Sequence, residues 1–261
     1  MSKYDNVVLV TRPEQQAANF IGLLEAKGIE ALSFPCIEIQ QVKLDRSLEE
    51  TLSTLDKIDL IIFISVNAVE QTSMLMQQQA IEPSLITAKI ATIGKATLKA
   101  AKLAGFKVSL SPENGFNSES LLKLKELQSD CINGNKCLIV RGVGGLEHLA
   151  DELTQRGAKV SYAEVYQRKK PLLDVNISRQ QLSRNWQSMG IGAITVTSNE
   201  SLQNLYDMLE SPGKEAMLNT LLIVASQRGF QLAQKLGFKS IKLALSAMDQ
   251  QMLEAVENEF Q

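Results

Sequence analysis

Short hydrophobic runs alternate with longer amphipathic stretches along the whole chain. The runs have the length of buried strands: VLV at 8–10, LIIFI at 60–64, KIATI at 89–93, CLIV at 137–140, ITV at 194–196 and LLIV at 221–224. Between them, apolar residues recur at helical spacing, and glycines such as Gly28 and Gly157 follow the last predicted turn. This alternation predicts an α/β protein with parallel sheets, doubly wound and flavodoxin-like.

The chain also repeats its own pattern, in three blocks that keep their order and a nearly constant offset. Matched positions carry the same residue type in both copies: Leu9 and Leu138, Arg12 and Arg141, Gly28 and Gly157, Ser65 and Ser198, and Gly105-Phe106-Lys107 with Gly237-Phe238-Lys239. Such a repeat predicts two similar α/β units. One large doubly wound sheet is the alternative, but it leaves the repeat unexplained.

Composition narrows the class of protein. The 261 residues are 44% hydrophobic and 21% charged, the balance of a globular protein with a substantial core. No apolar run is long enough to span a bilayer, and the N-terminal MSKYDNVVLV lacks the pattern of a signal peptide, so we expect a cytoplasmic protein without membrane contact. A net charge of −2 and an aromatic content of 5% disfavour a nucleic-acid partner.

The usual catalytic bases and metal ligands are scarce. The chain has one histidine, His148, and three cysteines without metal-type spacing. A zinc hydrolase site and a Ser-His-Asp triad are therefore disfavoured, and we expect neither a metal nor a cofactor. An odd number of cysteines fits reduced thiols.

A glycine-rich turn follows the predicted strand that ends at Arg141. A dinucleotide fingerprint starting with Gly142 and Gly144 needs a third glycine at position 147, where Glu147 would place a carboxylate against the pyrophosphate. No G-x-x-x-x-G-K-[ST] phosphate loop occurs either. Backbone N–H groups at a helix start, beside an arginine, still predict an anion site of another kind.

Cations and small polar residues follow every predicted strand. They form the groups Thr11-Arg12, Ser65-Val66-Asn67, Gly94-Lys95-Ala96-Thr97, Arg141-Gly142, Thr197-Ser198-Asn199 and Ser226-Gln227-Arg228. Because the carboxyl ends of parallel strands share one edge of a sheet, these residues predict a rim that binds a small polyanionic molecule. The alternative is local, since Ser65, Thr97 and Ser198 also suit helix N-caps.

Taken in order, these stretches resemble the uroporphyrinogen-III synthase family over essentially the whole chain. The matching segments are VLVTRPEQQA, FISVNAV, IATIGKAT, LIVRGVGGLEHLADELTQRGA, VSYAEVYQR, TVTSNESL and ASQRGFQLAQKLGF. Each motif alone is weak. The ordered set, with Tyr166 after the second Arg-containing block, is more specific.

The resemblance implies two α/β domains joined by a two-stranded β linker, with a cleft between them. It implies that the chain starts in one domain, builds the other and then returns. Residues 1–37 and 172–261 would form the first domain and residues 41–165 the second, connected through 38–40 and 166–171. The repeat alone allows either pairing of its blocks.

The implied activity is that of a cofactor-independent lyase. The family closes hydroxymethylbilane, a linear tetrapyrrole with eight carboxylates, to uroporphyrinogen III, with loss of water and inversion of the last ring. Such a substrate suits the predicted rim of cations and donors. The resemblance leaves room for a transient contact with hydroxymethylbilane synthase, and the absence of a strongly apolar exposed helix favours a monomer.

The resemblance assigns roles to individual residues. Tyr166 would be the weak general acid for the departing hydroxyl, and the alternative is that it only packs in the hinge. The remaining candidates would bind the substrate: Arg12, Lys95, Arg141 and Arg228 through its carboxylates, Ser65, Asn67, Thr97, Thr197, Ser198 and Ser226 through hydrogen bonds, and Gly94, Gly142, Gly144 and Gly145 through backbone amides.

A second class of function fits the same pattern. A two-domain binding or sensor module for a polyanionic metabolite would show the same repeat and polar rim, without an enzymatic activity. Tyr166 and the length of the resemblance favour the enzyme.

Overall fold

The computed structural model describes residues 6–115, 117–145, 147–171 and 178–260. The chain divides into two compact units, of which unit 1 comprises Met1–Glu38 with Lys169–Gln261, and unit 2 comprises Ile39–Arg168. The expected start of the second part of domain 1, at residue 172, lies outside the described residues.

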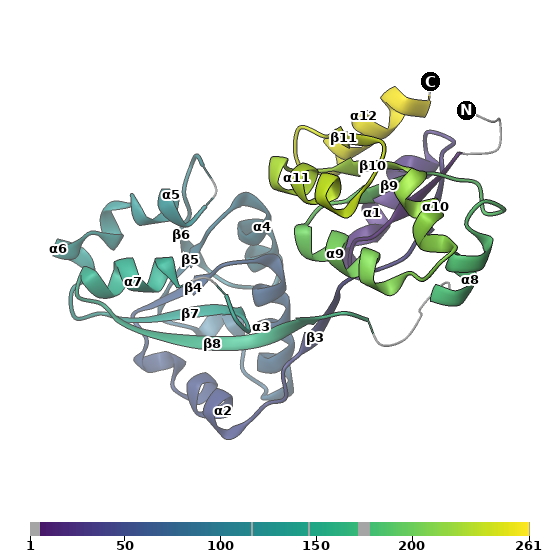
Figure 1. Cartoon of the computed structure of the whole chain (residues 1–261). Coiled ribbons are helices and arrows are strands. Elements are labelled where there is room, and N and C mark those ends of the chain that lie inside the picture. The colour runs from purple at the N-terminus through teal and green to yellow at the C-terminus, as the bar shows by residue number, and fades with distance from the viewer. Residues whose placement is uncertain (1–5, 116, 146, 172–177, 261) are drawn as a thin grey trace. The chain divides into compact units, whose positions relative to one another are not determined.

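Unit 1 is built from the two ends of the chain (Figure 1). Its strands are β1 (Val7–Val10), β2 (Glu30–Ser33), β9 (Ile191–Val196), β10 (Leu221–Val224) and β11 (Ile241–Leu243). Its helices are α1 (Glu14–Glu25), α8 (Arg179–Asn185), α9 (Asn199–Met208), α10 (Gly213–Asn219), α11 (Gln227–Leu236) and α12 (Asp249–Phe260).

Unit 2 is one continuous stretch of chain. Its strands are β3 (Glu38–Gln41), β4 (Leu60–Phe63), β5 (Lys89–Thr92), β6 (Val108–Leu110), β7 (Lys136–Gly142) and β8 (Lys159–Lys169). Its helices are α2 (Arg46–Ser53), α3 (Val66–Gln78), α4 (Lys95–Leu103), α5 (Ser118–Leu122), α6 (Ser129–Ile132) and α7 (His148–Gln155), with short 3-10 turns at Leu55–Lys57, Pro83–Leu85 and Lys125–Leu127.

Each unit holds one sheet. The order in unit 1 is β11-β10-β9-β1-β2, with every pair parallel. Read from the other side, and numbered by appearance within the unit, this is the 2-1-3-4-5 order of flavodoxin-like folds. The order in unit 2 is β3-β8-β7-β4-β5-β6, and β4 to β8 pair in parallel. The predicted α/β class is confirmed, with β3 beside β8 as the two-stranded connection.

The internal repeat is shared between the units rather than divided at their boundary. The matched blocks place β7 with β1, β4 with β9 and β5 with β10, and these strands stand in the same spatial order in both sheets. Unit 1 therefore combines the first block of one copy with the later blocks of the other. Glycines at matching helix ends adopt the same left-handed conformation, with φ of 72° at Gly28 and 92° at Gly157.

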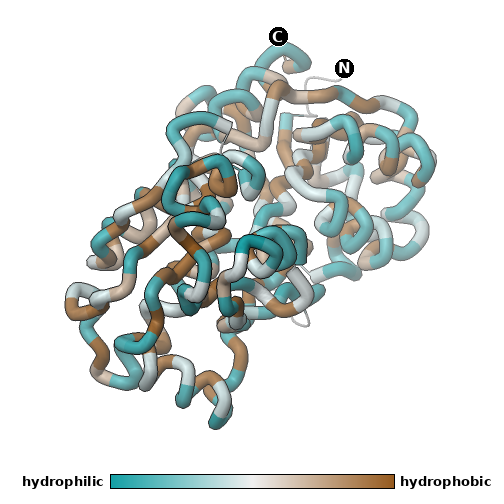
Figure 2. Tube along the Cα trace, turned by 90° about the vertical axis from the view of Figure 1, so that its left-hand side faces the viewer, coloured by the Kyte–Doolittle hydropathy of each residue, from teal (hydrophilic) through white to brown (hydrophobic). Residues whose placement is uncertain are grey.

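Helices cover both faces of each sheet because successive strand residues point to opposite sides. In unit 2, Ile61 and Phe63 pack in one buried cluster, and Leu60 and Ile62 pack in another. The same division separates Leu9 from Val8 and Val10 in unit 1. Figure 2 shows hydrophobic and hydrophilic stretches alternating along the trace, as amphipathic elements require. No helix in the described part of the chain is long and apolar enough to cross a membrane.

Candidate active site

The predicted residues of each unit follow the carboxyl ends of its strands. In unit 2 the positions after β4, β5 and β7 hold Ser65, Asn67, Gly94, Lys95, Thr97, Gly144 and Gly145, while Arg141 and Gly142 end β7 and Tyr166 lies near the end of β8. In unit 1 the positions after β1, β9 and β10 hold Arg12, Thr197, Ser198, Ser226 and Arg228. Because the strands are parallel, each set lies at one edge of its own sheet.

Tyr166 is held at this edge by a hydrogen bond to Ser65. The Ser65 Oγ lies 3.2 Å from the Tyr166 phenol oxygen, although 101 positions separate the two residues. Ser65 is also the N-cap of α3, and its Oγ accepts a hydrogen bond of 3.1 Å from the Ala68 N–H. The hydroxyl predicted as a cap or a ligand therefore serves as a cap and contacts the candidate acid.

The Tyr166 ring lies close to Gly142. A β-carbon at Gly142 would stand 2.7 Å from two carbons of this ring, so only glycine fits there. The β7–β8 register shifts between Arg141 and Gly142, and this irregularity sets Gly142 opposite Tyr166. The Val143 N–H then donates to the Tyr166 carbonyl at 2.8 Å. With 3% of its surface exposed, Tyr166 has one defined position.

Arg141 is buried and bound within unit 2. Its guanidinium lies 3.1 Å from a Glu164 carboxylate oxygen, donates to the Gly145 carbonyl at 3.0 Å, and stacks 3.6 Å from the centre of the Tyr162 ring. Glu164 also accepts a hydrogen bond from the Gly144 N–H. Burial raises the pKa of the Tyr162 phenol, and the Arg141 charge opposes this shift. Arg141 and Glu164 together fasten the 142–145 turn to β8.

A cavity of about 400 Å³ opens beside this turn. It is bordered by Gly142, Gly144, Gly145, Tyr166 and the apolar side chains of Ile64, Ile93 and Leu149. Val143, with 54% of its surface exposed, also lines it. Ser118, His148 and Arg168 add polar groups to its lining, so the cavity combines apolar and polar walls with Tyr166 at its border.

The remaining unit 2 candidates lie around the starts of α3 and α4. Gly94 is the N-cap of α4, so Thr97 stands inside the helix, buried, and does not cap it. Asn67 is buried in the first turn of α3. Lys95 is exposed at the start of α4. Their expected contacts with substrate remain predictions.

In unit 1, Arg12 is enclosed by its own unit. It forms an ion pair with Asp249 at the start of α12, donates to the Ala247 carbonyl at 2.9 Å, and lies 4.9 Å from the Phe20 ring centre. Asn19 donates a hydrogen bond to the same carboxylate. These bonds link the start of α12 to α1, so the guanidinium serves the packing of unit 1.

The other unit 1 candidates are more accessible. Ser198 and Ser226 are the N-caps of α9 and α11, where they accept hydrogen bonds from Ser201 and Gly229. Thr197 is half-buried before α9. Arg228 is exposed in the first turn of α11, and no ion pair to it occurs within the described residues. Among the predicted cations of unit 1, Arg228 is thus the one available to an incoming carboxylate.

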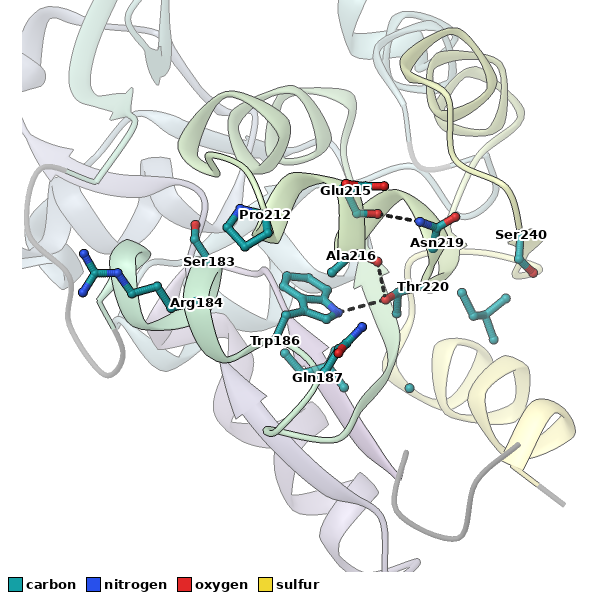
Figure 3. A pocket seen from close by; sticks show the side chains of 13 residues that line it. Ser183, Arg184, Trp186, Gln187, Pro212, Glu215, Ala216, Asn219, Thr220 and Ser240 are labelled. Atoms are coloured by element: carbon teal, nitrogen blue, oxygen red, sulfur yellow. Dashed lines mark hydrogen bonds between the residues drawn. The ribbon is translucent and has the colours of Figure 1, made fainter.

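A larger cavity, of about 740 Å³, lies at the opposite edge of the unit 1 sheet (Figure 3). It borders the amino ends of β9, β10 and β11 and contains none of the predicted residues. Its polar groups bond to one another, because Trp186 donates to Thr220 at 2.9 Å and Asn219 donates to the Glu215 carbonyl. Volume alone therefore favours this edge of unit 1, whereas the positions of the predicted residues favour the smaller cavity of unit 2.

Sequence reasoning missed the acidic partners of the two arginines. Glu164 lies in the same strand as Tyr166, and the strand period places Tyr162 and Glu164 on one face. Once β7 is paired with β8, this alternation of side chains along β8 indicates Glu164 as a partner of Arg141. For Asp249, 237 positions from Arg12, the sequence offers no comparable signal.

Comparisons with known proteins identify the family of this chain. Residues 18–254 match the family model described as uroporphyrinogen-III synthase HemD. The chain is 34% identical over 252 residues to uroporphyrinogen-III synthase of Escherichia coli, covering 96% of this chain and 99% of that protein. It is 30% identical over 208 residues to the putative uroporphyrinogen-III synthase of Methanothermobacter thermautotrophicus, covering 79% of each.

Two solved structures share the fold. A mutant uroporphyrinogen III synthase from Thermus thermophilus aligns with a TM-score of 0.59 at 15% identity, covering 98% of this chain and 99% of that one. The uroporphyrinogen-III synthetase of Helicobacter pylori aligns with a TM-score of 0.58, at the same identity and coverage. At this level of identity, the likeness concerns the fold alone.

Proposed function

The chain belongs to the uroporphyrinogen-III synthase family, and from this premise we propose that the Tyr166 edge of unit 2 removes water from hydroxymethylbilane. The predicted family is confirmed. Its reaction closes the linear tetrapyrrole to uroporphyrinogen III in porphyrin and heme biosynthesis. The roles of the individual residues, the lyase chemistry and the independence from a cofactor form our proposal.

The first chemical step is loss of the terminal hydroxyl. The pyrrole nitrogen lone pair pushes electrons toward the hydroxymethyl carbon as its C–O bond breaks, and the departing oxygen takes the phenol proton of Tyr166 and leaves as water. The electron-poor carbon then bonds to the terminal ring at the carbon that already carries that ring's methylene bridge. The old bond to this bridge breaks and re-forms at the ring's free α-carbon, which inverts the ring. The proton released in that closure restores the phenol, so the net change is the loss of one water.

One observation carries this assignment. The Tyr166 phenol stands at the carboxyl edge of a parallel sheet, fixed by Ser65 and Gly142, on the border of a cavity. The alternative, packing alone, does not need a hydroxyl in contact with another hydroxyl.

The carboxylates of the substrate require cations and hydrogen-bond donors. Arg228, exposed on α11, and Lys95, exposed on α4, suit direct contact with carboxylates. Arg141 contributes by fixing the turn that carries the Gly142 to Gly145 amides. Many weak contacts distribute the binding energy, so we expect any single lysine or arginine substitution to raise KM modestly.

The test is isomer analysis with freshly generated hydroxymethylbilane. Spontaneous closure gives the type I isomer, whereas the family's reaction gives type III. Tyr166→Phe keeps the ring and removes the phenol, and we expect its rate of type III formation to fall about 100-fold, the range of a general acid. Tyr206→Phe is the matched control, because Tyr206 lies on α9 beneath Lys214, away from the strand ends.

The outcomes separate the two parts of the proposal. Wild-type protein that yields only the type I isomer contradicts the function and favours the binding module. Tyr166→Phe protein that forms type III at the wild-type rate contradicts the acid role and leaves the function intact.

A further inference from the structure

We propose that Ser65 is a positioning residue for the reaction, and that its hydroxyl donates a hydrogen bond to the phenol oxygen of Tyr166. This inference rests on the proposed function, in which Tyr166 protonates the leaving hydroxyl. A phenol has one proton. It can reach the substrate only if the serine supplies the proton of the 3.2 Å hydrogen bond between the two hydroxyls.

The surroundings of Ser65 favour this direction. Its Oγ already accepts the Ala68 N–H at 3.1 Å, at the start of the 13-residue helix α3. A hydroxyl that accepts a hydrogen bond becomes a stronger donor, and the positive end of the helix dipole increases that effect. The chain of bonds therefore runs from the Ala68 amide through Ser65 to Tyr166, with the phenol proton at its end.

The phenol cannot turn away from this contact. Gly142 lies close to the ring, the Val143 N–H holds the Tyr166 carbonyl, and the residue is buried. Because the ring is fixed, the hydrogen bond from Ser65 determines where the phenol proton points. During the reaction Ser65 keeps its own proton, and only the Tyr166 proton moves to the leaving oxygen.

The repeat supplies an internal reference. Ser198 occupies the position of Ser65 in the other copy and caps α9 by accepting the Ser201 N–H. Its hydroxyl contacts the Ser201 hydroxyl at 2.9 Å, and Ile37 aligns with Tyr166. Capping therefore does not require a phenol partner, and the second role of the serine belongs to unit 2.

The test compares three substitutions at Ser65. Ser65→Ala removes both the cap and the donor, whereas Ser65→Gly removes the donor but caps almost as well as serine. Ser65→Thr keeps both. We expect kcat for type III formation to fall about tenfold in the alanine and glycine variants alike, as for one lost hydrogen bond to a group that gains charge, with KM unchanged. The threonine variant restores kcat.

Asp45→Ala is the control for cap loss. Asp45 caps α2 in the same unit by accepting the Leu48 N–H at 2.9 Å, and it lies outside the candidate site. We expect this variant to lower the melting temperature about as much as Ser65→Ala, without lowering kcat. If kcat follows melting temperature across all four variants, Ser65 is only a cap and the inference is wrong.

A double-mutant cycle makes the test specific. In a Tyr166→Phe background, where the phenol is absent, Ser65→Gly should cause no further loss of kcat. A further tenfold loss would show that Ser65 acts on the substrate directly. Wild-type protein that forms no type III isomer would instead contradict the proposed function, so the two failures are distinguishable.

Discussion

The carboxyl edges of the two sheets carry matched residues, but these residues make different contacts in the two units. Arg12 follows β1 and Arg141 lies at the end of the matched strand β7, and each forms an ion pair inside its own unit. The Arg12 pair ties the connection after β1 to the start of α12, whereas the Arg141 pair fastens a glycine turn beside a cavity. Where unit 2 has Tyr166 against its capping serine, unit 1 has the buried Ile37.

Both copies of the repeat therefore form the same scaffold, whereas the phenol that we propose as the acid belongs to unit 2. Strand ends, helix caps and terminal glycines are needed by any doubly wound sheet, so both copies have them. The phenol, the glycine beside it and the shifted register of β7 and β8 occur together in unit 2. A substitution should therefore affect stability or turnover according to the edge on which it falls.

Among substitutions that leave Tyr166 itself unchanged, the largest expected effect is that of Gly142→Ala. The new β-carbon would lie 2.7 Å from the Tyr166 ring, so the ring would have to shift from its present position. Displacing a catalytic group by about 1 Å can cost on the order of 100-fold in rate, and we expect a loss of kcat for type III formation approaching that value.

Gly22→Ala is its control in the other unit. Nothing lies within 4 Å of the added carbon in α1, and alanine there should raise stability by about 1 kcal/mol. Gly142→Ala protein with wild-type turnover would show that Tyr166 does not need its present position.

Arg12→Ala should act mainly on stability. It removes the buried partner of Asp249, whose side chain keeps 23% of its surface exposed. We expect the free energy of unfolding to fall by about 2 kcal/mol, below the usual range for a fully buried pair because of that exposure. Denaturant melts give this value, and Arg46→Ala, which breaks the exposed pair with Glu50, should change little. A large rise in KM with unchanged stability would instead make Arg12 a substrate ligand.

The smallest effects concern the cysteines, which report on opening of each unit. Burial, with the Asp59 charge nearby, raises the pKa of Cys137 in unit 2 to about 11, and burial also raises the pKa of Cys36 in unit 1. The thiolate is the reactive form, so iodoacetamide at pH 8 should modify the exposed Cys131 first.

The pH dependence has a definite sign. Because folding raises the Cys137 pKa, its contribution to stability is complete below the unfolded value near 9 and is lost as pH rises toward about 11. Mass spectrometry of labelled peptides follows each thiol. Cys137 labelling as fast as Cys131 would show that unit 2 opens more readily than its packing indicates.

The sequence predicts the helices and strands well, but it does not predict the acidic residues that pair with the arginines. Strands, helix ends and the α/β class follow from local periodicity and glycine placement, which need no distant contact. Arg12 and Arg141 were expected to be available cations, but Asp249 and Glu164 occupy them through contacts that only the folded chain creates. Thr97 suited a cap by residue type, yet Gly94 takes that position because the helix starts at Lys95.

The crossing of repeat blocks between the units also sets an order of events during synthesis. The strands of unit 2, β3 to β8, lie between Glu38 and Lys169, so this unit can fold once residue 169 has left the ribosome. β1 cannot pair with β9 until residues 191–196 are made. During synthesis, β1 therefore lacks its β9 partner while unit 2 folds. A ribosome stalled after unit 2 and before β9 would carry a folded unit 2 and a β1 strand without its β9 partner.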